Sequence, residues 1–337
     1  MIQKLLSSVL TLSLTATMAF AGDAVVYNAI NGDVEAQYND FIKNKIEDVG
    51  FALSDPHLRI NDAYKAKYGA KTLEDGSANP EYDSDWKVTL DNLGFYSISN
   101  DIALRELLIK APQLGGFSPF NLHAYKKVGE DTTYVAHIAP TAMLDIVGVE
   151  DKEVRSKFVE MFKPLDNLIL DEFGGKVEVS QYKALPEKKM MTYELSFDRP
   201  EDLTDYLDEF QEEFEAAFED AGYIIAGFHN FKEVYEDEEL EFSKYDAYFV
   251  YSLCHFTYSY NMFNKGRPDA GVFAPCAMYM YIEKDSNKLI IGMPTMFDWT
   301  AIMNLEDKTM VKSVNDLNEE ITNVMLSLGA KQIWKNY

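Results

Sequence analysis

The sequence predicts an α+β fold class, with two similar domains in tandem, each a two-layer α/β sandwich on a mostly antiparallel sheet. Three observations predict it. The pattern PxxGxFxP occurs twice, from Pro112 and from Pro268, and each copy runs into a strand-like alternation of apolar residues. The segments on either side of the pattern repeat in the same order. The chain of 337 residues is also long enough for two domains of about 150 residues.

Each copy begins with a strand that is followed by an amphipathic helix. The strands are predicted at residues 24–30 and 190–197. Each helix carries apolar residues at a spacing of three or four and ends at a glycine, Gly50 in the first copy and Gly222 in the second. The apolar residues are Tyr38, Ile42, Ile46 and Val49 in the first copy and Phe210, Phe214, Phe218 and Ala221 in the second. Such stripes are typical of core-facing helices.

The first copy is longer than the second after this helix. The extra residues fall in the stretch 65–86, KAKYGAKTLEDGSANPEYDSDW, which is rich in Gly, Asn, Asp and Ser. This composition predicts a long surface loop.

The PxxGxFxP pattern predicts a turn between a short helix and a strand. Its first proline ends the helix, its glycine permits a positive φ, its phenylalanine anchors the turn, and its second proline starts the strand. We expect the turns to shape the edge of a cleft where a ligand would bind. The turn residues are Pro112, Gly115, Phe117 and Pro119 in the first copy and Pro268, Gly271, Phe273 and Pro275 in the second.

A hairpin and a long helix complete each copy. The hairpin turns are predicted at residues 128–133 and 283–288, and both long helices begin with EDK, whose acidic residues suit a helix N-terminus. In the first copy Gly174 and Gly175 end the helix, and the next strand-like segment either pairs with the first sheet or bridges the two. Five matching apolar positions lie on one face of each helix: Val154, Phe158, Met161, Leu165 and Leu168, and Met310, Val314, Leu317, Ile321 and Val324.

The first residues of the chain predict export. A single Lys4 precedes an apolar run that ends in AFA before Gly22, which is the pattern of a cleaved secretory signal. An uncleaved membrane anchor is the alternative, and no later stretch is apolar enough to span a bilayer. We therefore expect a periplasmic or secreted protein. The predicted division is a signal peptide at 1–21, a first repeat domain at 24–174, a connector at 175–188, a second repeat domain at 189–330 and a tail at 331–337.

The charge balance excludes some classes of partner. The chain has 31 Lys and Arg against 56 Asp and Glu, for a formal net charge of −25. Nucleic acids and anionic lipids both require basic patches, so neither is an expected partner. The acidity indicates solubility, with weak cation binding as an alternative, and the oligomeric state is left open.

The stretch SLCHFTYSYNMFNKGRPDAGVFAPCAMYMYIEK resembles the domain-of-unknown-function 302 (DUF302) family. That family pairs a CN at a strand end with an LPC at the start of the next strand. Cys254 matches the first cysteine, His255 replaces the asparagine, and Pro275 with Cys276 matches the second element. The resemblance implies a compact α+β domain and no established reaction.

The first copy keeps less of the family pattern. Ser99 and Asn100 keep the asparagine without its cysteine, and Pro119 is followed by Phe120 and Asn121 instead of a cysteine. Any chemistry of the cysteines is therefore expected in the second copy.

Cys254 and Cys276 are the two cysteines of the chain, and the sequence leaves several hypotheses about their chemical state open. An oxidising compartment favours a structural disulfide. Two unpaired, buried thiols are a second reading. The functional readings are a redox pair, or a soft-metal site for an ion such as Cu(I), completed by His255 and by Met278 or Met280.

Other chemical signals are weak. The sequence has no GxSxG, HExxH, P-loop, GxGxxG, EF-hand or CxxCH pattern. The remaining histidines are scattered without metal-ligand spacing: His57, His123, His137 and His229. We expect His123 to be a half-exposed strand residue.

These observations favour an exported, non-catalytic binding or accessory protein, with a ligand or soft-metal site in the second copy. A thiol-based redox protein using Cys254 and Cys276 is the first alternative. A purely structural envelope protein is the second. No cofactor is indicated, and the identity of the ligand stays open.

Overall fold

The computed structural model describes residues 21–333, so the predicted signal peptide lies, except for Ala21, outside the described residues. The chain forms two six-stranded sheets, in the orders β2-β3-β4-β5-β1-β6 and β12-β7-β11-β10-β9-β8. The strand pairs within the two sheets are antiparallel. The predicted α+β class with antiparallel sheets is therefore confirmed.

The first sheet and its helices come from the first half of the chain. Its elements are β1 (Gly22–Asn31), α1 (Glu35–Asn44), η1 (Ile46–Val49), β2 (Ala52–His57), α2 (Ile60–Tyr64), η2 (Lys65–Gly69), β3 (Leu90–Ser99), α3 (Asp101–Lys110), η3 (Pro112–Phe117), β4 (Phe120–Lys127), β5 (Thr132–Ile138), α4 (Pro140–Ile146), α5 (Lys152–Phe173) and β6 (Lys176–Tyr182).

The second sheet comes from the second half. Its elements are β7 (Met190–Ser196), α6 (Leu203–Asp220), β8 (Tyr223–Asn230), α7 (Phe231–Asp237), β9 (Tyr245–His255), α8 (Phe256–Ser259), η4 (Tyr260–Asn264), η5 (Pro268–Phe273), β10 (Cys276–Glu283), β11 (Lys288–Pro294), α9 (Met296–Ile302), α10 (Lys308–Ser327) and β12 (Lys331–Ile333).

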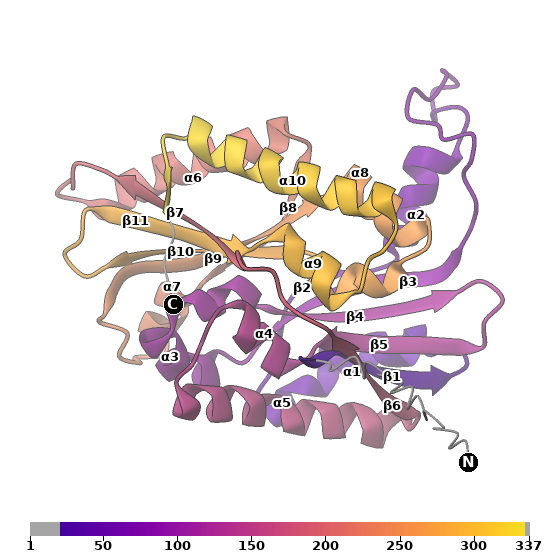
Figure 1. Ribbon diagram of the computed structural model, residues 1–337, viewed down its shortest axis with the longest axis horizontal. Helices are drawn as coiled ribbons and strands as arrows, with labels where there is room; N and C mark the ends of the chain where they lie inside the picture. The colour runs from indigo at the N-terminus through magenta and orange to yellow at the C-terminus, as the bar shows by residue number, and fades with distance from the viewer. Residues whose placement is uncertain (1–20, 334–337) are drawn as a thin grey trace, which may run out of the picture.

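The two sheets face one another, and the long helices cover their outer faces (Figure 1). Helices α6 and α10 lie over the second sheet, and α5 lies under the first, where Phe173 packs against the rings of Tyr38 and Phe41 of α1. The apolar stripes predicted for α5 and α10 face the core. Four of the five predicted positions in each helix are buried, and Leu168 and Met310 are partly buried.

In each EDK sequence the aspartate is the residue that caps the start of the helix. Asp151 accepts hydrogen bonds from the backbone N–H groups of Glu153 and Val154, and Asp307 does the same for Thr309 and Met310. These side chains satisfy N–H groups that have no partner within the helix. The segment after α5 is also placed: β6 pairs with β1 and so completes the first sheet.

The PxxGxFxP turns are exchanged between the halves. Turn η3 of the first half packs on β10 and β11, and η5 of the second half packs on β4 and β5. Tyr248 donates a hydrogen bond to the Pro112 carbonyl, and His123 bonds through Nε2 to the Pro268 carbonyl at 2.7 Å. Each turn is therefore buried against the sheet of the other half.

The glycines of the turns are required for close approach. The expected positive φ is wrong, because neither Gly115 nor Gly271 has one. A Cβ on Gly115 would lie 2.6 Å from the Cβ of Tyr279, and one on Gly271 would lie 2.5 Å from Cε1 of His123 and 2.8 Å from Cε1 of Phe95. The hydrogen atom of glycine lets the turn reach the opposite sheet.

His123 is fully buried between the halves, so the expected half-exposed position is wrong. Its Nδ1 lies 3.0 Å from the Gly94 carbonyl and its Nε2 lies 2.7 Å from the Pro268 carbonyl. A neutral imidazole has one N–H and donates to one of the two. Burial nevertheless lowers the pKa of His123 to about 4, outweighing the two carbonyls.

The stretch 65–86 is largely exposed and irregular after η2, as predicted, but part of it is docked on the second half. Residues 60–89, here called the insert, begin with α2 and η2 and pack on the second half, where Tyr68 stacks on Tyr260 with ring centroids 4.0 Å apart. Aromatic side chains scattered in a polar sequence make this contact, which composition alone does not reveal. The polar residues do form the outer part of the segment.

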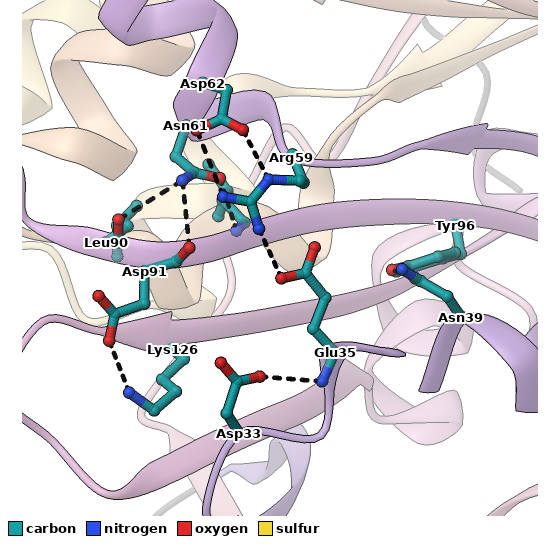
Figure 2. A network of polar contacts seen from close by, with 11 residues as sticks. Asp33, Glu35, Asn39, Arg59, Asn61, Asp62, Leu90, Asp91, Tyr96 and Lys126 are labelled. Carbon is teal, nitrogen blue, oxygen red and sulfur yellow. Dashed lines mark hydrogen bonds and ion pairs between the residues drawn. The ribbon is translucent and has the colours of Figure 1, made fainter. Parts of the chain in front are cut away.

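A network of polar contacts fixes the base of the insert to the first sheet (Figure 2). Arg59 bonds to Glu35 and to Asp62 at 2.6 Å each. The side chain of Asn61 donates to the Asp91 carbonyl at 3.3 Å and accepts from the Leu93 N–H at 3.1 Å. The start of the insert is therefore held in place beside β3.

We expect Gly271→Ala to lower the free energy of unfolding by about 1–3 kcal/mol, because the added methyl overlaps His123 and Phe95. Urea denaturation measures this change. In the His123→Ala background the same substitution should cost less, since the imidazole is gone. An equal cost in both backgrounds would contradict the proposed overlap.

We expect His123 to make the fold less stable in acid. Its folded pKa of about 4 lies below the ordinary value of 6.5, so its contribution is complete above pH 6.5 and is lost as the pH falls toward 4. The difference corresponds to about 3 kcal/mol of unfolding free energy. Urea denaturation between pH 7.5 and 4.5 should show a smaller loss for His123→Asn than for the natural protein, and parallel profiles would refute the assignment.

Candidate functional site

The two cysteines lie at the adjoining ends of two neighbouring strands. Cys254 is the penultimate residue of β9, and Cys276 is the first residue of β10. Cys276 pairs with Leu253, one position away from Cys254. The two cysteines are therefore neighbours at this end of the sheet. Both are free thiols in the structure, and each is partly exposed to solvent.

Both cysteines line one small cavity at the end of the second sheet. Its volume is about 20 Å³, which is room for a single water molecule. Met293 of β11 and Trp299 of α9 contribute to its wall. The predicted Met278 is fully buried and is not part of that lining. The sequence pointed to the wrong methionine because Met293 reaches the cavity from the next strand.

The environment keeps the thiols protonated. Burial raises the pKa of Cys254 to about 11, and burial together with the neighbouring Cys254 raises the pKa of Cys276 further. At pH 7 roughly one Cys254 thiol in ten thousand is ionised, since each pH step below the pKa reduces the thiolate tenfold. Neither cysteine has the lowered pKa of a reactive thiol.

His255 caps a helix. Its Nδ1 accepts a hydrogen bond from the backbone N–H of Tyr258 at 3.2 Å, at the start of α8. The proton of the neutral ring is then on Nε2, which lies 3.7 Å from Oε1 of Glu320. Burial lowers the pKa of His255, which favours this neutral form.

Asn100 has the same role in the first half. Its side chain accepts a hydrogen bond from the Ala103 N–H at 3.1 Å and caps α3. The residue after the first cysteine position is therefore a helix cap in both halves, and an asparagine suits that role as well as a histidine does.

Three buried oxygen atoms at or beside the cavity have no hydrogen-bond partner among the described residues. They are the hydroxyls of Tyr223 and Tyr258 and Oε1 of Glu320. The two tyrosines line the cavity together with Cys276, and Glu320 lies beside His255. Burial, and with it the nearby Glu320 carboxylate, raises the pKa of Tyr223. Sequence reasoning missed these residues because a tyrosine-rich strand also reads as core.

The first half has an aromatic cluster where the second has the cysteines. Phe120, the counterpart of Cys276, packs against Phe158 and Phe162 with ring centroids 5.7 and 4.7 Å apart. Ser99, the counterpart of Cys254, bonds to Asp101. Asn121 donates to the Pro275 carbonyl across the interface between the halves at 2.8 Å.

The turns expected to frame a cleft lie inside the contact between the halves. A cavity of about 20 Å³ remains between them, lined by Phe117, Pro119, Phe273, Pro275 and Cys276. The peptide bonds before Pro119 and Pro275 are both cis. Cys276 therefore separates this cavity from the one that it shares with Cys254.

The other histidines form hydrogen bonds within the fold. His57 bonds to the Ala226 carbonyl at 2.7 Å and His229 to Asp101 at 3.1 Å, both between the halves. His137 is buried beside Asp166, 2.8 Å away. Within residues 21–333 there is no group of three or more His, Cys, Asp and Glu side chains that could hold a metal ion. In the same residues, no helix has the length and apolar composition needed to cross a membrane.

Comparisons with known proteins give matches among solved structures. No family model matches the sequence, and no curated protein matches it. A solved structure to which the chain is similar is the crystal structure of an uncharacterized conserved DUF302 protein from Bacillus stearothermophilus. The two are 19% identical, the match covers 40% of this chain and 94% of that chain, and the TM-score is 0.32.

We expect both thiols to react slowly with iodoacetamide in the folded protein at pH 8. Their raised pKa values should slow alkylation at least 100-fold relative to the protein in 8 M urea, because iodoacetamide reacts with the thiolate. Mass spectrometry of quenched samples measures the rates. Fast modification of the folded protein at either cysteine would contradict the protonated state.

Proposed function

We propose that the chain is an exported, non-catalytic binding or accessory protein, built from two tandem copies of one DUF302-like module, with its ligand site in the second copy. Export rests on the signal pattern that ends before Gly22. The predicted repeat domains, 24–174 and 189–330, would each gain a final strand, since β6 and β12 pair with the first strand of their own half.

The duplication is supported by matching positions in the two sheets. Read from β2 and from β8, the two strand orders are the same, and the last strand of each half lies beside its first. The exchanged turns, the helix caps at Asn100 and His255, and the caps at Asp151 and Asp307 occupy corresponding places. Independent origins would not produce this agreement at several unrelated features.

One observation carries the binding role: three residues that bear sulfur line one cavity. Cys254, Cys276 and Met293 are the soft ligands that suit a monovalent ion such as Cu(I). The cavity admits one atom-sized guest, which favours an ion over an organic ligand.

Because both thiols are protonated, the binding of an ion would depend on pH. The ion would replace the two thiol protons, so its affinity should rise with pH. The unpartnered hydroxyls of Tyr223 and Tyr258 are near the sulfur atoms and could donate to the thiolates formed. His255 is occupied as a helix cap and is left out of the proposed ligand set.

The redox alternative has less support. A redox pair needs a thiol with a lowered pKa, whereas both thiols here have raised pKa values. A purely structural role remains the outcome if no ligand binds.

We expect the protein to bind one Cu(I) ion, lost in Cys254→Ser and in Cys276→Ser. Anaerobic titration against a chromogenic chelator, with native mass spectrometry, measures affinity and stoichiometry. Met293→Leu should weaken binding about tenfold or more, because a soft ligand is removed while the volume is kept.

Met278→Leu is the matched control, since that buried methionine lies outside the cavity lining and should leave the affinity unchanged. A protein that binds no Cu(I), or whose Cys276→Ser variant binds equally well, would refute the metal site. Export is tested separately, by a periplasmic mass that begins at Gly22.

A further inference from the structure

The cavity of the cysteines is closed on one side by a short lid. The lid is residues 256–264, which form α8 and η4. Tyr258, Ser259 and Phe263 of the lid contribute to the cavity wall. The Ser259 side chain also lies close enough to Cys254 to lower the pKa of its thiol, against the larger effect of burial. A guest that reaches the sulfur atoms from this side must pass the lid.

The insert of the first half packs directly on this lid. Tyr64 donates a hydrogen bond to the Ser259 hydroxyl at 2.8 Å, and its ring centroid lies 5.1 Å from that of Phe256. Tyr68 stacks on Tyr260, and its hydroxyl lies 3.0 Å from the Thr257 hydroxyl. The two tyrosines of the insert therefore hold the first part of the lid, residues 256–260.

Polar contacts tie the far part of the insert to the end of the lid. Asp83 accepts a hydrogen bond from Tyr260 at 2.8 Å and pairs with Lys265 at 2.9 Å. The bond from Lys265 lowers the pKa of Asp83 to about 2, so this carboxylate is charged at ordinary pH. Thr89 donates to the backbone and side-chain oxygens of Asn264 at 2.8 and 2.9 Å.

The corresponding segment of the second half, between β8 and β9, packs in turn on the first half, but it is shorter than the segment between β2 and β3. In the other direction, α7 packs on α3, and Tyr235 donates to the Asp101 carbonyl at 2.9 Å. The chain between β8 and β9 runs over residues 231–244, whereas the chain between β2 and β3 runs over residues 58–89. The longer version lies on the half that contains both cysteines.

The seam between insert and lid is better suited to opening than the core is. Its contacts are hydroxyls, an ion pair and stacked rings, and its outer side adjoins a polar cleft of about 460 Å³ lined by Lys87, Tyr260, Asn264 and Lys265. Water can replace these polar partners. Both η2 and η4 are π-helical, a conformation that is rare and is frequently found at functional sites.

We propose that the insert is a gate for the second half: it holds the lid over the cysteines, and its release admits a guest to Cys254 and Cys276. The first half, which lacks the cysteines, thereby controls access to the site of the second. The identity of the guest rests on the proposed function, whereas the gating of the thiols does not.

The test is the rate at which iodoacetamide modifies Cys254 in the folded, full-length chain. Tyr68→Ala removes the stack on Tyr260 and the bond to Thr257, and should speed modification at least tenfold. Asp83→Asn removes the charge that holds Lys265 and should speed it to a smaller extent. Tyr82→Ala is the matched control, because Tyr82 is an aromatic residue of the same insert whose ring lies against Lys71.

Measurements between 0 and 2 M urea separate opening of the gate from unfolding. Opening of the gate exposes little surface and should give rates that depend weakly on urea. Unchanged rates in both variants, or faster rates that follow the loss of global stability, would overturn the gate. If Tyr68→Ala does not fold, Asp83→Asn decides.

Different experimental results would refute the proposed gate and the proposed metal site. Faster alkylation in Tyr68→Ala by a protein that binds no Cu(I) supports the gate and refutes the ion. Tight Cu(I) binding, with alkylation and Cu(I) association rates that are the same in Tyr68→Ala and the natural protein, supports the ion and refutes the gate.

Discussion

The close approach of two glycines to the opposite sheets is the constraint on which the molecule depends. At Gly115 and Gly271 a turn from one half reaches the face of the other, at a distance that leaves no room for a methyl group. This contact sets the separation of the sheets, buries His123, and brings the insert of the first half to the lid of the second. The surroundings of the cysteines are thus built by residues from both halves.

The two halves use corresponding positions for different purposes. Where the first half has Phe120 in a cluster of rings, the second has Cys276 beside a cavity of about 20 Å³. Where the first half has the long insert, the second has the shorter α7. The first half supplies the cluster of rings and the long insert, and the second half supplies the sulfur atoms. A function argued from the second half alone would leave out the insert that packs on its lid.

The sequence predicts what depends on neighbours in the chain. The helix stripes, the acidic starts of α5 and α10 and the repeated turns are all local patterns, and the structure has them. The position of His123, the docking of Tyr68 and the choice of Met293 over Met278 depend on contacts between distant segments, for which spacing gives no signal. The cap at His255 was readable in principle, since Asn100 occupies the same place.

Each sheet is completed within one continuous stretch of chain, because β6 returns to β1 and β12 returns to β7. Within residues 21–333 no strand is shared between the sheets, and the contacts between the halves include turns, rings, hydrogen bonds and the ion pair of Asp83 with Lys265. The backbone ladder of the first sheet can therefore close before the second half has left the ribosome. The surfaces of the first half that contact η5 and the lid are then formed before the second half folds. The first half therefore serves as a template for the folding of the second half.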